Sequence, residues 1–332
     1  MLFVLLQACS LLGDPAPTGT LLAIQEVDGQ PRTVLVDIGT GERTPVDGPG
    51  EAVFPGPADP RGTHLLLVST EETPEGHRET LILQPRAGGE PVVLAPAAEM
   101  VRNPSFSPDG SFLVFESSAN SFRDIYRVQR DGSGLVRLTD AQHGSFEPQV
   151  SPDGQRIVFA SSRDGNAELY VMNADGAEQT RLTDSRDDDT RPGWLPDGRI
   201  AWLHQMGASK LVWRMDIDGG NAHVLRRRTT PTIDHDWAVN ADGSTIVIAT
   251  QTSAREIDLL LFDTATKEGV TLGGPGVDEM PSFSPDGRFV VWTSNQTGDP
   301  ELWVAGADGS SPRVIAPRPG PDWLPRWLPE PE

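Results

Sequence analysis

Histidine and aspartate are the residues of this chain whose chemistry suits a divalent cation. The chain contains six His and a single Cys, which excludes zinc sites built from several thiolates. No His residues have a spacing typical of metal ligands, and Asp187-Asp188-Asp189 lacks the ligand positions of an EF-hand loop. The sequence therefore predicts no cofactor and no metal site, with His143 and His235 as weak metal candidates.

The single cysteine, Cys9, follows the apolar run Leu2 to Leu6. Leu6-Gln7-Ala8-Cys9 resembles the lipobox of bacterial lipoproteins. The resemblance implies that residues 1–8 are a signal peptide, that Cys9 receives a diacylglyceryl group, and that residues 9–19 are a tether. The protein would then be anchored in the bacterial cell envelope, facing the periplasm or the exterior. A signal peptide that is removed without lipidation and a buried first strand are the alternatives.

Overall charge argues against one class of partner. The chain has 27 basic and 48 acidic residues, a net charge of −21. Because neutralising phosphates requires clusters of Lys and Arg, we expect no nucleic-acid partner. The only basic run, Arg226 to Arg228, is predicted to be a solvated strand edge.

One turn sequence recurs along the chain. FSPDG occupies residues 106–110 and 283–287, with SPDG at 151–154 and LPDG at 195–198. The acidic residues of these and one looser copy are 44, 44, 45 and 44 positions apart, and further steps of similar length reach Glu330, Arg61 and Thr18. Eight positions thus enclose seven intervals, and strand-rich periods near 44 residues are typical of β-propeller blades.

The residue types of this turn are those that stabilise a turn. Its Pro fixes φ for a type I turn, its Asp accepts hydrogen bonds within the turn, and its Gly takes the left-handed conformation. We therefore expect the turn aspartates to be structural rather than catalytic.

Each interval carries the signals of four strands. Two long apolar runs follow the turn, such as 111–118 and 124–129, and an Asp-Gly turn leads to a short third strand. The fourth strand begins with Pro, as at Pro104 and Pro281, so it needs a free edge and is predicted to be innermost in its blade. Aromatic residues recur at one position of the second long strand and are expected to pack in the core: Tyr126, Tyr170, Trp213 and Trp303.

The two ends of the chain complement each other. Residues 20–27, 33–38 and 43–46 supply three strands without an innermost one, and residues 324–328 form a lone innermost-type strand. We predict an all-β fold: a seven-bladed β-propeller of four-stranded antiparallel blades spanning residues 20–332 as one domain, closed by N- and C-terminal strands that share one blade.

The repeat is similar to that of the TolB-like β-propeller superfamily. The similarity rests on P-x-[FW]-S-P-D-G, a D/E-[IL]-[YW] strand, D-G and R-L-T, as in residues 106–139 and 150–183. TolB itself carries an N-terminal α/β domain that does not match this chain. The repeat also resembles propellers of prolyl-oligopeptidase-type enzymes, but the G-x-S-x-G elbow of their hydrolase domain is not found in the sequence.

The loop-rich face of the disc, opposite the SPDG turns, is where the repeats differ most. Residues just before the innermost strands are expected to surround the channel mouth there and to bind a ligand: Arg102, Glu147, Arg191, His235, Asp236, Glu279 and Trp323.

Two functions remain open. The first is a non-catalytic, monomeric envelope scaffold that binds a protein, peptide or glycan at this face. The second is a metal-dependent lyase or hydrolase with its site at the channel mouth, suggested by the similar propellers of oligogalacturonate lyases.

Overall fold

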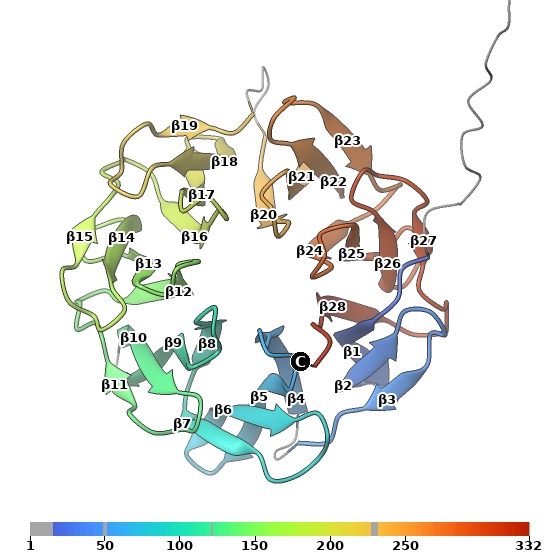
Figure 1. The fold of residues 1–332 in the computed structure, drawn as a ribbon, viewed down its shortest axis with the longest axis horizontal. Helices are drawn as coiled ribbons and strands as arrows, with labels where there is room; N and C mark the ends of the chain where they lie inside the picture. The colour runs from blue at the N-terminus through green and yellow to red at the C-terminus, as the bar shows by residue number, and fades with distance from the viewer. Residues whose placement is uncertain (1–15, 49–51, 121, 227–231, 332) are drawn as a thin grey trace, which may run out of the picture.

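The computed structural model describes residues 16–48, 52–120, 122–226 and 232–331. The proposed signal peptide, Cys9 and most of the tether lie outside these residues. Within them are 28 strands and no helix, arranged as seven four-stranded antiparallel sheets around a central axis (Figure 1). The predicted all-β, seven-bladed propeller is confirmed.

Each sheet forms one blade, which we number from the N-terminus and write from the innermost strand outward. Blade 1 contains β28 (Asp322–Trp327), β1 (Thr20–Val27), β2 (Gln30–Asp37) and β3 (Arg43–Pro45). Blade 2 contains β4 (Ala52–Ala58), β5 (His64–Thr73), β6 (Gly76–Pro85) and β7 (Val92–Ala98). Blade 3 contains β8 (Val101–Phe106), β9 (Phe112–Asn120), β10 (Phe122–Gln129) and β11 (Val136–Arg137).

The remaining blades repeat this order. Blade 4 contains β12 (Ser145–Val150), β13 (Arg156–Ser161), β14 (Glu168–Asn173) and β15 (Thr180–Arg181). Blade 5 contains β16 (Asp189–Trp194), β17 (Ile200–Met206), β18 (Ser209–Met215) and β19 (His223–Val224). Blade 6 contains β20 (Asp234–Val239), β21 (Thr245–Ser253), β22 (Glu256–Asp263) and β23 (Gly269–Leu272). Blade 7 contains β24 (Asp278–Phe283), β25 (Phe289–Ser294), β26 (Glu301–Gly306) and β27 (Arg313–Val314).

Blade 1 closes the ring as predicted. β28 pairs antiparallel with β1, Trp327 opposite Leu21 and Trp323 opposite Ile24. Trp327 is buried in a cluster that includes Val291 of blade 7. Figure 1 shows β28 beside β1. Pairing β28 with β1 removes the open edge that β1 would otherwise present.

Aromatic pairs fill the blades. Phe115 lies opposite Tyr126 with ring centroids 5.7 Å apart, and Trp292 lies opposite Trp303 at 6.0 Å. The same pairing recurs in blades 4 and 5. The second member of each pair is the aromatic position expected in the core, which the structure confirms.

The SPDG turns have the predicted hydrogen bonds. Asp109 accepts from the Ser111 amide at 3.0 Å and from the Ser107 hydroxyl at 2.7 Å, and Gly110 has φ 63°. These bonds from Ser111 and Ser107 lower the pKa of Asp109 to about 2. The carboxylate is therefore engaged within its turn.

Arg226 differs from expectation. It was predicted to be part of a solvated edge, but its guanidinium is largely buried, forms an ion pair with Asp234 at 3.2 Å and donates to the Thr250 hydroxyl at 3.0 Å. The pairing with Asp234 offsets the cost of burying the charge, which the run of like charges in the sequence did not indicate. Arg227 and Arg228 lie outside the described residues.

Candidate functional site

The centre of the ring encloses a cavity of about 970 Å³. Its walls come from β4, β8, β12, β20, β24 and β28, the innermost strands of six blades. Proline and aromatic side chains form a large part of the lining, among them Phe54, Pro55, Pro104, Trp237, Pro281 and Phe283. A mostly apolar cavity of this size with a few polar groups has the character of a ligand site.

The innermost strands are bulged, and this shapes the mouth of the cavity. The ladder between β8 and β9 shifts register between Arg102 and Ser105, and Asn103 within the bulge has φ 47°. The equivalent residue has positive φ in four other blades: Glu147, Arg191, Met280 and Leu324. Each of these residues directly precedes a proline, so the bulge is where the strand gives up a ladder hydrogen bond.

Pro104 and its equivalents therefore lie inside their strands, and not at the strand starts as expected. The predicted mouth residues are displaced with them: all seven belong to the innermost strands rather than to the loops before them. The bulge lets a strand accommodate Pro because the residues around it leave the regular ladder.

Buried aspartates hold the starts of several innermost strands. Asp189 accepts a hydrogen bond from the indole N–H of Trp202 at 2.7 Å, and Asp278 from that of Trp292 at 2.9 Å. Asp322 pairs with Arg43 at 2.7 Å. These contacts fix the first residues of the innermost strands, and thereby the backbone that carries the mouth residues.

A chain of polar contacts runs along the rim of the mouth through the neighbouring blades 3, 4, 5 and 6. The buried Glu116 accepts from the amide of Glu147 at 2.8 Å, and Glu147 in turn accepts from the amide of Arg191 at 2.6 Å. Arg191 forms an ion pair with Asp236 at 2.5 Å. The indole of Trp237 donates to the Arg191 carbonyl at 3.3 Å. Burial raises the pKa of Glu116, although the Glu147 amide bond opposes that rise.

The structure thus brings together Glu147, Arg191 and Asp236 of the predicted mouth residues. Arg102 instead pairs with Glu79 of blade 2. His235 is exposed, and Glu279 and Trp323 are partly buried on β24 and β28.

Arg326 is a cavity residue that sequence reasoning missed. It lies on β28, four residues before Glu330, the last position of the repeat. Burial lowers the pKa of its guanidinium; the carboxylate of Asp236 opposes this effect, and Arg191 adds to it. Aligning each repeat on its turn acid would have singled out this charged side chain.

The weak metal candidates lie on different parts of the ring. His143 is exposed in the loop between β11 and β12 and lies beside Phe122, with ring centroids 6.4 Å apart. His235 is on β20. Over residues 16–48, 52–120, 122–226 and 232–331, no group of three or more His, Cys, Asp or Glu side chains is arranged to hold a metal ion.

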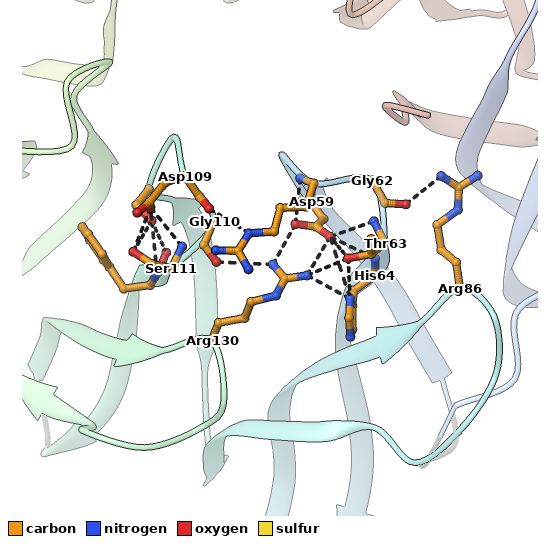
Figure 2. Close-up of polar contacts among 12 residues, drawn as sticks. Asp59, Gly62, Thr63, His64, Arg86, Asp109, Gly110, Ser111 and Arg130 are labelled. Carbon is orange, nitrogen blue, oxygen red and sulfur yellow. Dashed lines mark hydrogen bonds and ion pairs between the residues drawn. The ribbon is translucent and has the colours of Figure 1, made fainter. Parts of the chain in front are cut away.

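A second polar cluster lies on the opposite face, at the turn of blade 2 (Figure 2). Asp59 replaces the serine of the SPDG turn and accepts from the amides of Arg61, Thr63 and His64. Arg130 of blade 3 donates to both Asp59 oxygens at 2.8 Å and lies 2.8 Å from His64 Nδ1.

This cluster contains Asp, His and Thr but is not arranged for nucleophilic catalysis. His64 Nδ1 faces both the Arg130 guanidinium and the Thr63 hydroxyl, the latter at 2.8 Å. Burial and the charge of Arg130 lower the pKa of His64. Burial alone would raise the pKa of Asp59, but hydrogen bonds from Arg130 and the turn amides hold it at about 2. The cluster therefore links two blades.

The fold and the cavity define a closed seven-bladed β-propeller with a ligand-sized central channel. Residues 137–330 match the family model described as TolB beta propeller domain. The chain belongs to this family.

Several curated bacterial proteins match part of the sequence. An uncharacterized protein of Agrobacterium fabrum is 35% identical over 106 residues, which is 32% of this chain and 36% of that protein. The Tol-Pal system protein TolB of Anaeromyxobacter dehalogenans is 30% identical over 112 residues, which is 34% of this chain and 25% of that protein. The matched stretches thus span about a third or less of each relative.

Solved structures share the fold across most of the chain. TolB from Acinetobacter baumannii has a TM-score of 0.59 at 20% identity, covering 93% of this chain and 82% of that one. An oligogalacturonate lyase in complex with manganese has a TM-score of 0.65 at 14% identity, covering 90% and 84%. Similarity at this level concerns the fold alone.

Among the described residues there is no helix long and apolar enough to cross a bilayer.

Proposed function

We propose that this protein is a non-catalytic binding scaffold of the bacterial cell envelope that holds a peptide segment of a partner protein in its central channel. The observation that carries the proposal is the cavity of about 970 Å³, walled by proline and aromatic side chains and open to the charged mouth. Catalysis by the turn aspartates is disfavoured because Asp109 and its equivalents are engaged within their turns.

The channel suits an extended peptide better than a flat protein surface. Proline and aromatic walls such as Pro104 and Trp237 favour apolar side chains and stacked prolines. The mouth adds paired charges, among them Arg191 and Asp236, that can exchange partners with the polar groups of a peptide backbone.

The location in the envelope rests on two sequence features. The lipobox-like residues before Cys9 support lipid anchoring, and one relative is named as a protein of the Tol-Pal system. Under this proposal Cys9 carries the lipid and the propeller acts as a monomer outside the cytoplasm.

Panning a displayed peptide library against the immobilised protein tests the channel. Ala238 lies on the channel wall, so Ala238→Trp fills the space that a peptide would occupy. Val270 is exposed on β23, and Val270→Trp is the matched control. We expect peptides selected on the wild type to bind Val270→Trp equally and Ala238→Trp at least tenfold more weakly.

Equal binding to wild type and to a folded Ala238→Trp protein would overturn the proposal. Ser282→Trp, at the equivalent wall position of blade 7, is used in the same way if Ala238→Trp does not fold.

A further inference from the structure

The position four residues before the turn acid lines the central cavity in blades 1, 3, 4, 6 and 7. It is occupied mainly by small or uncharged residues: Ser105, Gln149, Gly193, Ala238 and Ser282. In blade 1 the same position is Arg326. Arg326 and all of these except Gly193 line the cavity. One guanidinium therefore projects from a wall that is otherwise short and uncharged at this level.

The arginines around Arg326 have partners. Arg102, which also lines the cavity, pairs with Glu79, and Arg191 at the mouth pairs with Asp236. Asp236 also accepts from the amide of Trp237 at 2.9 Å. The guanidinium of Arg326 has no hydrogen-bond or ion-pair partner among the described residues, although the charge of Asp236 acts on it.

A partly buried, unpaired guanidinium is costly unless something binds it. Its planar set of N–H donors matches a carboxylate, which can accept two parallel hydrogen bonds. A doubly charged phosphate suits the site less well, because a single free cation would face it while Asp236 repels it.

We propose that Arg326 is the anchoring subsite of the channel and binds a carboxylate of the inserted peptide, from either its C-terminus or an Asp or Glu side chain. This rests on the proposed function, which identifies the channel as a peptide site. The apolar walls at Phe54 and Phe283 would hold the neighbouring side chains, so that the carboxylate sets the position of the peptide along the channel.

The first experiment uses the smallest probe. Propionate is titrated into the protein at constant ionic strength in chloride, with the neutral isostere propionamide in parallel. NMR follows the Nε–H signal of Arg326 and the indole N–H signal of Trp237, which also lines the cavity and is present in every variant. We expect a saturable shift with propionate and none with propionamide. Arg326→Met should abolish binding, whereas Arg288→Met, which removes an exposed turn arginine, should leave it within twofold. Equal responses to propionate and chloride would overturn the subsite.

The second experiment separates the two sources of the carboxylate. Peptides selected by panning are compared with a free or amidated C-terminus, and with Asp and Glu replaced by Asn and Gln. We expect one of these neutralisations to weaken binding at least tenfold to the wild type and less than twofold to Arg326→Met. If neither does, the subsite is wrong while the channel proposal stands. If propionate binds through Arg326 but no peptide is retained, the proposed function fails and the anion subsite stands.

Discussion

The buried pair Asp59 and Arg130 links blades 2 and 3, and its loss should lower the free energy of unfolding. Arg130 contacts both Asp59 oxygens at 2.8 Å, with side chains 14% and 0% exposed. Arg130→Met leaves the Asp59 carboxylate buried without its counterion, which costs about 3–5 kcal/mol. Asp59→Asn instead leaves the Arg130 guanidinium without its counterion, while its hydrogen bonds to the Gly110 carbonyl and the Thr63 hydroxyl remain. Because each single change strands a buried charge, the double variant should be less destabilised than the sum of the two.

Equilibrium unfolding in urea at pH 7 measures the free energy of unfolding of the wild type, the two single variants and the double variant. Arg288 and Asp286 provide the control, since they form an ion pair of similar length at 2.7 Å but are 61% and 47% exposed. Arg288→Met should change the free energy of unfolding by less than about 1 kcal/mol. Additive effects of Asp59→Asn and Arg130→Met, or a loss no larger than for Arg288→Met, would refute the idea that this pair joins the blades.

The same pair predicts a pH dependence. The pKa of Asp59 falls from 3.8 to about 2 in the folded protein, so the unfolded chain binds more protons between these values. The contribution of Asp59, about 2 kcal/mol, is fully present above pH 3.8 and is lost as the pH falls through about 2. The lowered pKa of His64 also makes the folded protein less stable as the pH falls below 6.5. Asp59→Asn should therefore flatten the acid limb of the stability curve.

Three further predictions concern closure, the mouth and metal binding. Deleting residues from Trp323 onward removes β28 and exposes the edge of β1, so the protein should aggregate or unfold at a lower temperature in a thermal melt; a soluble truncation of unchanged stability would count against closure by this strand. Replacing Arg191 and Asp236 together by Ala should weaken peptide binding in a pull-down with little change in melting temperature, because their ion pair is partly exposed; unchanged binding would argue against a mouth contribution. Elemental analysis of the purified protein should find no stoichiometric divalent metal, whereas one equivalent of manganese lost on changing His143 and His235 to Ala would favour the enzyme alternative.

The blade count and the closure could be predicted because they depend on local chemistry that repeats. The SPDG turn requires Pro, Asp and Gly for reasons internal to five residues, so its period shows the period of the fold. The lone C-terminal strand could be assigned to β1 because a ring leaves only one free edge for it. Both features are visible in sequence letters alone.

The mouth was harder to predict because it depends on irregular backbone and on contacts between blades. Because of the bulge, Arg102 and Pro104 lie within β8. The sequence patterns that predict a strand do not predict a residue with positive φ inside it, such as Asn103. The pairing of Asp59 with Arg130 joins residues 71 positions apart, which no local pattern reveals. Arg326 was also missed, although the register of the repeat alone sets this residue apart.

Site-specific photocrosslinking in bacterial cells tests most directly whether the channel is the binding site. A photoreactive amino acid is placed at Gln149, on the channel wall, or at the exposed Val270 on the outer strand β23. Binding in the channel predicts an adduct from position 149 that maps by mass spectrometry to one defined, acid-containing segment of an envelope protein, and none from position 270. Adducts of equal yield from both positions, or no adduct from position 149, would contradict it.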